Sequence, residues 1–354
     1  MSRSRDLQVT RLSTLESIRK LAPEWGELWG RQAEATPFQS PDWLLPWIES
    51  FRPHDLWVLE VRQEGRLLGV APLFEYESEN KERTLAILGA GISDYLDVIV
   101  DRNHANEVVQ AIFGFLANAE AGWNRVELLD LRKNSPLLSW SAGPDWQTQS
   151  ADYDVCPRLV FRSSPDEPGQ AIPSRQHRNL KTAKNRIRRE GRVQITLADR
   201  TTLSEHLETL FRLHAARWRE SRKPGVLANE VVKDFHRKAA PLLFESGMLR
   251  LYTLRLNQEP IAALYTLWRP DVVYLYLQGF DFAYAEYSPG MQIIAAVVED
   301  ALKHGRQAID FLRGREAYKY GWGARDETTF RRILCRSKAD EPAMREADPL
   351  RLAS

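Results

Sequence analysis

The chain has 354 residues, of which 43% are hydrophobic and 27% are charged, and its formal net charge is +1. This length exceeds one ordinary core and predicts two domains, while the composition excludes a disordered or fibrous chain. The small net charge gives no global attraction to nucleic acid or to an anionic membrane, so no DNA partner is expected. Two cysteines cannot form a disulfide framework, and neither a signal peptide nor an apolar run of about 18 residues is present, so we expect a cytoplasmic protein without a transmembrane segment.

The first part of the chain predicts two helices followed by an antiparallel meander. Residues 15–31 carry apolar side chains at helical spacing, and Ser40-Pro41-Asp42 is typical of a second helix start. Strands are predicted at 56–61, 67–76, 84–88 and 95–100, then a helix at 103–121 and strands at 125–131 and 155–161. Three prolines in 163–173 mark a linker, so the first domain is predicted to cover residues 1–165.

The second part repeats this order of elements. The predicted elements are a basic helix at 174–190, a strand at 193–198, helices at 203–220 and 230–245, strands at 249–256, 260–268 and 272–280, a helix at 291–304 and a strand at 308–312. They define a second domain at 166–335, which leaves a tail at 336–354. The repeated order indicates either a duplicated α+β unit or two unrelated domains with a similar meander.

The stretch from Tyr274 to Gly323 is the most informative for function. There a strand leads through Ser288-Pro289-Gly290 into an apolar helix. The first turn of a helix offers backbone N–H groups at the positive end of its dipole, which suits a pyrophosphate. The alternative is an ordinary helix start in which Ser288 caps the helix and no ligand binds.

Several short motifs in this stretch resemble one family. Gly279-Phe280-Asp281, Ser288-Pro289-Gly290, Asp310-Phe311 and Tyr318-Lys319 resemble the GNAT acetyltransferases of the CelD/BcsL-like group, which is associated with cellulose and exopolysaccharide biosynthesis. The same tandem architecture is seen in the FemABX transferases, which the chain resembles at Asp310-Phe311 and Tyr318-Lys319. The resemblance implies an α+β fold of tandem GNAT-like domains, each with a mixed, mostly antiparallel central sheet flanked by helices.

The resemblance also implies how a cofactor is held. In GNAT folds two neighbouring strands splay apart, here 273–280 and 308–312, and an acyl-CoA lies along the first of them. Acetyl-CoA or another acyl-CoA is therefore the expected co-substrate, although Ser-Pro-Gly stands where a basic, glycine-rich phosphate loop is usual. The expected cofactor-binding residues are Leu277, Gln278, Gly279, Phe280, Ser288, Pro289, Gly290, Met291 and Gln292.

Catalysis on a thioester needs a base for the acceptor proton and donors for the oxyanion. We expect Asp310 or Glu316 to take the proton, and Lys319 or Tyr318 to stabilise the oxyanion or an anionic acceptor. For Lys319 the resemblance to FemABX proteins supports this role. The alternatives are that Asp310 is bonded to Arg313 or Arg315, and that Lys319 is a solvated surface lysine.

The acceptor is expected to meet basic and aromatic residues. Residues 175–192 contain eight Lys or Arg and one acidic residue, so they form either a phosphate clamp or a solvated helix face. RNA is the third alternative for the partner of such a helix. No RNA-binding signature accompanies this helix in the sequence. The expected substrate-binding residues are Arg175, His177, Arg178, Lys181, His214, Trp218 and Arg313.

Two further features of the sequence each have two explanations. His214, Trp218 and His236 are explained equally well by a packed helix pair. Ser93-Asp94-Tyr95-Leu96-Asp97 is either a wall of the acceptor site or a turn capped by an aspartate. The spacing of His and Cys residues matches no metal site, so no metal is expected.

The sequence thus predicts an acyl-CoA-dependent N-acyltransferase. Acetyl transfer to an amino group of a sugar or other small acceptor in a surface-polysaccharide pathway is expected, with association with polysaccharide-synthesis proteins. One alternative is a FemABX-like transferase that uses aminoacyl-tRNA, although no heptad pattern predicts the long helical hairpin of those proteins. Another is a non-catalytic subunit of a polysaccharide-synthesis assembly.

Overall fold

The computed structural model describes residues 7–78, 81–161, 172–220 and 225–336, except for the side chains of residues 217–220. By its internal contacts the chain divides into two units, which are the described parts of Met1–Asp154 with Thr328–Leu352 and the described parts of Val155–Glu327. We refer to them as unit 1 and unit 2. No helix among the described residues is long and apolar enough to cross a membrane.

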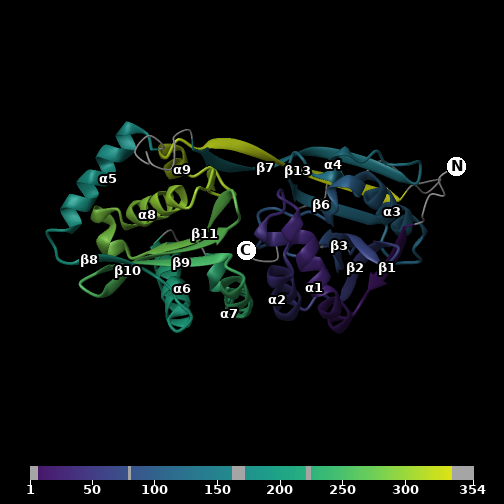
Figure 1. Cartoon of the computed structure of the whole chain (residues 1–354), viewed down its shortest axis with the longest axis horizontal. Coiled ribbons are helices and arrows are strands. Elements are labelled where there is room, and N and C mark those ends of the chain that lie inside the picture. Colours follow the sequence, from purple (N-terminus) through teal and green to yellow (C-terminus); the bar gives the residue numbers. More distant parts are fainter. Residues whose placement is uncertain (1–6, 79–80, 162–171, 221–224, 337–354) are drawn as a thin grey trace. The chain divides into compact units, whose positions relative to one another are not determined.

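Unit 1 consists of helices around a mostly antiparallel sheet (Figure 1). Its sheet has the order β1-β2-β3-β4-β6-β13, with β5 paired to β3. Among the described strands of this unit, β4 and β6 run parallel, in register from Thr84↔Arg125 to Ala86↔Glu127, and β2, β3 and β4 run antiparallel. The elements are β1 (Gln8–Leu12), α1 (Leu15–Arg31), η1 (Pro37–Gln39), α2 (Pro41–Phe51), β2 (Asp55–Gln63), β3 (Arg66–Glu77), β4 (Arg83–Ile87), β5 (Ile99–Val100), η2 (Arg102–His104), α3 (Ala105–Asn118), β6 (Arg125–Leu131), α4 (Pro136–Ser139) and the end of β13 (Arg325–Arg336).

Unit 2 repeats this plan. Its sheet begins with the end of β7 and continues β12-β11-β10-β9-β8, and in the described part of this sheet β11 and β12 are the parallel pair. Helices α5 and α8 cover one face of this sheet, and α6 and α7 cover the other (Figure 1). The elements are β7 (Trp146–Val160), α5 (Ser174–Ile187), β8 (Val193–Leu197), α6 (Leu203–Glu220), η4 (Val226–Ala228), α7 (Glu230–Glu245), β9 (Leu249–Leu256), β10 (Glu259–Trp268), β11 (Val272–Phe280), η5 (Phe282–Tyr287), α8 (Pro289–Lys303), β12 (Ala308–Asp310) and α9 (Ala317–Gly321).

The expected α+β fold class is confirmed, and the two units share their order of elements. In each, two helices precede three antiparallel strands, and a helix then leads to a strand that runs parallel to the third of them. The repeated order of elements that the sequence predicts is therefore present in the fold. This agrees with the reading of a duplicated unit.

The strands β7 and β13 both contribute residues to each unit. From Phe330 to Cys335, β13 pairs with β6 of unit 1, while β7 pairs with β12 of unit 2 through Arg158 to Val160. The predicted ranges 1–165 and 166–335 differ from the units here, because backbone pairing joins residues 328–336 to unit 1. The proposed boundary at 165 and the tail after 336 fall outside the described residues.

Local sequence signals account for most element ends. The side chains of Thr14 and Ser40 accept hydrogen bonds from Ser17 N and Trp43 N, which caps α1 and α2. The strand predicted at 95–100 is shorter, because only Ile99 and Val100 pair with β3. The strand predicted at 308–312 ends at Asp310, since Leu312 has a φ of 58°, outside the β region.

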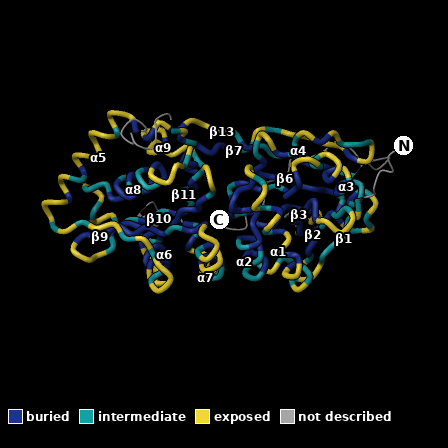
Figure 2. Tube along the Cα trace, viewed as in Figure 1, coloured by how far each residue is buried: buried dark blue, intermediate teal, exposed yellow. Residues whose placement is uncertain are grey.

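Each unit has a core of buried hydrophobic residues, and Figure 2 marks the buried residues in dark blue along the chain. In unit 2, α8 buries Ile293, Val297 and Ala301 against the sheet, and α5 adds Leu180 and Ile187 to the same cluster. Burying such a side chain stabilises the fold by about 1.5–3 kcal/mol. The helices α5 and α8 are thereby fixed on the sheet face next to β11.

Candidate active site

The strands β11 and β12 diverge in the middle of the unit 2 sheet. They pair at three positions, Val272↔Ala308, Val273↔Ile309 and Tyr274↔Asp310. Beyond this point β12 ends, whereas β11 continues to Phe280 alongside β10. The pairing of these two strands therefore stops at Asp310, at the point where the family resemblance implies a splay.

The backbone of β11 alternates between the two edges of the strand. Asp281 N donates to Ile261 O at 3.0 Å, and the register continues with Gly279 opposite Ala263. In an antiparallel pair, every second residue directs its N–H and C=O to the partner strand. The intervening residues Gln278 and Phe280 consequently direct theirs to the edge on the side of the splay.

The start of α8 lies beside this part of β11. The Gln278 amide donates to Gly290 O at 2.9 Å, which ties the strand to the first turn of the helix. Ser288 occupies the N-cap position with a φ of 50°, but its side chain makes no capping hydrogen bond. The expected cap by the Ser288 hydroxyl is therefore wrong, whereas Pro289 does lie in the first turn of α8.

The side chains of the other cofactor-binding residues predicted at this turn mainly pack against the protein. Pro289 is buried in the first turn of α8, and Gln292 is only 2% exposed and donates to Tyr287 O at 2.7 Å. Met291 packs partly buried against the core. Pro289 has no N–H, and the N–H groups of Ser288, Met291 and Gln292 already donate to Ala285 O and Ser288 O. A ligand at this turn would therefore meet Gly290 N rather than these side chains.

The opposite face of β11 is in close contact with α6. A Cβ atom added at Gly279 would stand 2.3 Å from His214 N, so only glycine allows this approach. Leu277 is also buried in the strand. The predicted cofactor residues on β11 thus alternate between the α8 face, reached by Gln278, and the α6 face, reached by Gly279.

The loop after β12 brings together the predicted catalytic residues. Asp310 is 3% exposed, and its Oδ1 accepts a hydrogen bond from Leu312 N at 2.8 Å. Glu316 lies at the N-cap of α9, where its carboxylate forms an ion pair with Lys319 at 2.9 Å. Arg315 forms its ion pair with Asp326, at 3.7 Å.

The Lys319 side chain is buried and points back into this loop. Its Nζ donates to the carbonyl oxygens of Leu312 at 2.9 Å, Arg313 at 2.6 Å and Gly314 at 3.1 Å. An ammonium group has three N–H donors, and here they face three carbonyls and one carboxylate. Lys319 therefore holds the loop in place in this structure, and it is not a solvated surface lysine.

Two neighbours of this loop differ in accessibility. The Tyr318 ring is 40% exposed and stands edge-on to Phe311, with ring centroids 6.3 Å apart. Arg313 is half-buried. Arg313 lies in the loop that Lys319 holds, and Tyr318 precedes Lys319 in α9.

Sequence analysis missed Arg158, which pairs with Asp310 across β7 and β12. Burial lowers the pKa of Arg158, but the negative charges of Glu327 and Asp310 raise it above its ordinary value. Arg158 thus places a positive charge next to the Asp310 carboxylate. No sequence signal links two residues so far apart in the chain, because the contact depends on strand pairing.

The basic helix α5 packs on α8 and exposes its charges. Lys184 forms an ion pair with Glu299 of α8 at 3.2 Å, and Leu180 is buried between the helices. The predicted substrate-binding residues on α5 are all exposed, namely Arg175, His177, Arg178 and Lys181. They therefore form an accessible cationic surface on the face of the sheet that also carries α8.

The histidines predicted to contact the acceptor lie on the opposite face of the sheet. His214 and His236 are 3% and 0% exposed, on α6 and α7. The His236 ring packs between Tyr265 and Tyr276, and burial together with the nearby His214 lowers its pKa to about 3. The structure does not bring these two residues together with Asp310 and α5, and the Trp218 side chain lies outside the described residues.

Comparison with known proteins identifies one family for part of the chain. Residues 174–320 match the family described as acetyltransferase (GNAT) domain. The chain therefore contains a GNAT acetyltransferase domain, and the matched segment includes β11, α8, β12 and α9. No curated protein matches the chain. Among the described residues, no group of three or more His, Cys, Asp or Glu side chains could hold a metal ion.

Solved structures resemble the chain over most of its length. FemX has a TM-score of 0.66 at 11% identity, covering 92% of this chain and 96% of that chain. A protein of unknown function from Bacteroides thetaiotaomicron has a TM-score of 0.57 at 10% identity, covering 94% and 100%. The C-terminal domain of a protein named as a lysylphosphatidylglycerol synthetase, from Agrobacterium fabrum, has a TM-score of 0.55 at 10% identity, covering 91% and 93%. At these identities the likeness concerns the fold alone.

Proposed function

We propose that unit 2 binds an acyl-CoA along β11 and transfers its acyl group, acetyl in the simplest case, to an amino group of a small acceptor. The observation that carries this proposal is the divergence of β11 from β12 beside the start of α8. This divergence lies within the segment that matches the GNAT domain. The amides of the pantetheine arm would pair with the edge of β11 beyond Tyr274, and the pyrophosphate would meet the first turn of α8.

The corresponding place in unit 1 is filled by the chain itself. There β4 and β6 pair in parallel up to Ala86↔Glu127, as β11 and β12 do in unit 2. Beyond that point Leu96 N donates to Asp130 O at 3.3 Å, so the loop after β4 bridges to the end of β6. This difference favours unit 2 over unit 1 as the donor site.

The reaction requires attack of a neutral amine on the thioester carbonyl. The new C–N bond forms, the C–S bond breaks, the amine proton passes to a base, and the CoA thiolate leaves and takes up a proton. Asp310 stands where the splay begins and is shielded from solvent, which suits a base acting directly. Glu316 is 53% exposed and could take the proton through water.

The acceptor in this proposal is an amino sugar or another small amine of a surface-polysaccharide pathway, as in the CelD/BcsL-like group. The exposed cationic surface of Arg175, His177, Arg178 and Lys181 supports an acceptor that carries phosphate, such as a nucleotide-linked or lipid-linked sugar. Association with polysaccharide-synthesis proteins and a cytoplasmic location belong to the same proposal.

A second candidate is transfer from aminoacyl-tRNA to the acceptor. The observation that favours it is the same cationic surface on α5, because basic helices bind phosphate backbones without reading sequence. It requires a donor that is far larger than acyl-CoA. The two candidates can therefore be separated by the donor.

The decisive experiment is a thiol-release assay on the full chain with acetyl-CoA and a panel of amines: glucosamine, glucosamine 6-phosphate and UDP-glucosamine. Acceptor-dependent release of CoA, with an N-acetylated product found by mass spectrometry, is the expected result. Transfer of an aminoacyl group from charged tRNA, without any release from acetyl-CoA, would support the second candidate. Absence of both transfers would support the non-catalytic alternative.

A further inference from the structure

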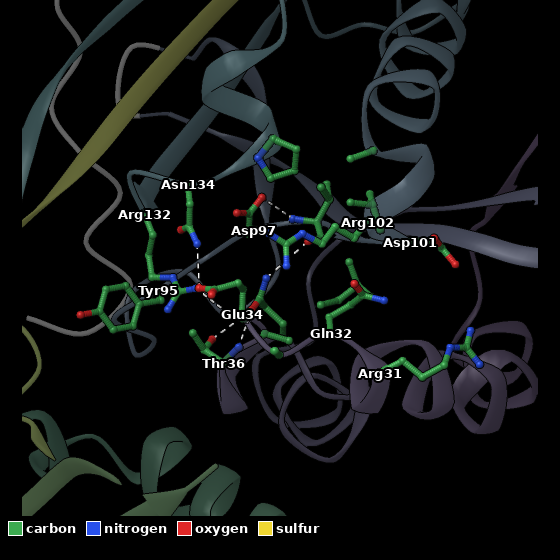
Figure 3. Close-up of a pocket in the computed structure, with 18 of the residues that line it drawn as sticks. Arg31, Gln32, Glu34, Thr36, Tyr95, Asp97, Asp101, Arg102, Arg132 and Asn134 are labelled. Carbon is green, nitrogen blue, oxygen red and sulfur yellow. Dashed lines mark hydrogen bonds and ion pairs between the residues drawn. The ribbon is translucent and has the colours of Figure 1, made fainter. Parts of the chain in front are cut away.

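Unit 1 contains a cavity of about 600 Å³ that acyl transfer in unit 2 does not use (Figure 3). Its wall consists of the end of α1 with the following loop, the segment around β5 and η2, and the loop after β6. Such a volume lies within the range of small-molecule sites. The polar residues of the wall are Arg31, Gln32, Glu34, Thr36, Gln39, Arg66, Tyr95, Asp97, Asp101, Arg102, Asn103, Arg132 and Asn134.

Hydrogen bonds between distant segments hold this wall in shape. The Glu34 carboxylate accepts from Arg132 at 3.1 Å and from Asn134 at 2.7 Å, which ties the loop after α1 to the loop after β6 (Figure 3). Gln39 donates to Val98 O at 3.4 Å and ties the first of these loops to the segment around β5. A ligand would therefore meet a wall that is already formed, which lowers the entropy lost on binding.

The charges in the wall do not balance. Arg132 is paired with Glu34, and Arg66 is paired with Asp101 at 2.7 Å. Arg31 and Arg102 also line the cavity, and neither forms an ion pair with any residue that the structure describes. Two cationic side chains thus remain available to an anion in the cavity.

Asp97 is the acidic residue of the wall that lacks an arginine partner at ion-pair distance among the described residues. It accepts from Val98 N at 2.8 Å, and it keeps accessible surface towards the cavity. Burial raises the pKa of Asp97 to about 7. The hydrogen bonds from Ser135 and Val98 and the charge of Arg132 lower this pKa, but by less than burial raises it. Near neutral pH this carboxyl can both donate and accept, which suits a ligand hydroxyl.

We propose that the unit 1 cavity binds a small anion that carries hydroxyl groups, either a sugar phosphate or a sugar carboxylate. Arg102, which Figure 3 shows directed toward Asp97, pairs with the anionic group, and Asp97 hydrogen-bonds to a hydroxyl. Arg31 adds positive charge at the edge of the cavity. This ligand site is separate from the acyl-CoA site on β11, and the inference does not depend on acyl transfer. The inference gives a ligand-binding role to unit 1. In that unit Leu96 N donates to Asp130 O, so the chain itself occupies the place beyond the paired ends of β4 and β6.

The test is calorimetric titration of the full chain with glucose 6-phosphate, glucuronate and neutral glucose at pH 7. The double variant Arg31→Gln, Arg102→Gln is compared with Arg19→Gln, which removes an exposed arginine of α1 that does not line the cavity. Neutral glutamine preserves most of the side-chain length, and the affected arginines are exposed, so both variants should fold. Circular dichroism would check this.

We expect saturable binding of one or both anions, at least 10-fold weaker binding of glucose, and at least 10-fold weaker anion binding by the double variant. Arg19→Gln should bind like the wild type. The proposal is overturned if no anion binds at millimolar concentration, or if the double variant binds as tightly as the wild type. Competition by acetyl-CoA would also overturn it, because the anion would then occupy the α8 site.

Discussion

Replacing Lys319 with methionine should act mainly by destabilising unit 2. We expect a smaller direct effect on the reacting groups. Methionine fills a similar volume but leaves the carbonyls of Leu312, Arg313 and Gly314 without their donor. Leaving a buried acceptor without its hydrogen bond costs about 1–3 kcal/mol, so the loss at the three carbonyls together amounts to about 3–5 kcal/mol. The ion pair with Glu316 adds at most about 1 kcal/mol to this figure, because that carboxylate is 53% exposed.

The assay is urea unfolding of the full chain, followed by circular dichroism, together with hydrogen exchange of residues 308–323. We expect Lys319→Met to lose about 3–5 kcal/mol in the free energy of unfolding and to lose exchange protection in this segment. Two matched variants serve as controls. Glu316→Gln should lose less than about 1 kcal/mol, and Lys181→Met, at an exposed lysine of α5, should be unchanged.

One outcome would refute this reasoning. If Lys319→Met unfolds like the wild type and keeps its exchange protection, but no longer transfers the acyl group, the ammonium acts on the reacting atoms. The hypothesis from sequence, in which Lys319 stabilises the oxyanion, would then describe its role better than loop positioning does.

Four further predictions concern other buried residues. Asp310→Asn keeps an acceptor for Leu312 N, so the free energy of unfolding in urea should change by less than about 1 kcal/mol. The acyl-transfer rate should fall about 100-fold or more. An unchanged rate would exclude Asp310 as the base. Gly279→Ala brings a Cβ atom to 2.3 Å from His214 N and should cost about 1–3 kcal/mol in urea unfolding, and a neutral result would mean that α6 can move away. For Asp97, whose pKa burial raises from 3.8 to about 7, the folded state binds a proton that the unfolded chain lacks between these pH values. The free energy of unfolding should therefore fall as pH rises from about 4 to 7, by at most about 4 kcal/mol, and Asp97→Asn should remove this dependence; equal pH profiles of the two proteins would contradict it. For His236, whose pKa burial lowers from 6.5 to about 3, the unfolded chain binds the extra proton, so stability should fall as pH drops below 6.5. His236→Phe should weaken this acid sensitivity in thermal unfolding, and identical profiles would show that His236 can charge without cost.

Apolar periodicity and turn residues predicted the ends of several helices and strands correctly. The helices α6 and α7 and the strands β9 and β11 have the predicted ends, because apolar periodicity and the flanking turn residues decide them. The strand β13 was missed, and β7 begins before its predicted start. Pairing of β13 with β6 depends on residues about half a chain away, which no local pattern reports.

For the candidate site, the sequence predicted which residues lie near one another but not the contacts that they make. The sequence placed Asp310, Glu316 and Lys319 near the divergence of two strands, and the structure brings them into one loop. It did not predict that the Lys319 ammonium turns inward, since burial of a lysine by three carbonyls leaves no sequence signal. Nor did it indicate Arg158, which reaches Asp310 only through the pairing of β7 with β12.

The central claim is that an acyl-CoA binds with its pyrophosphate at the first turn of α8. It is tested most directly by calorimetric titration of acetyl-CoA into the wild type and into Gly290→Glu and Gly290→Gln. Both variants crowd Gln278 equally, with a Cβ atom at 3.1 Å from its amide, and they differ only in charge. We predict saturable binding to the wild type and at least 10-fold weaker binding to the glutamate variant than to the glutamine variant, because a negative charge would face the pyrophosphate. Equal affinities of the two variants, or no binding to the wild type at millimolar acetyl-CoA, would contradict the claim.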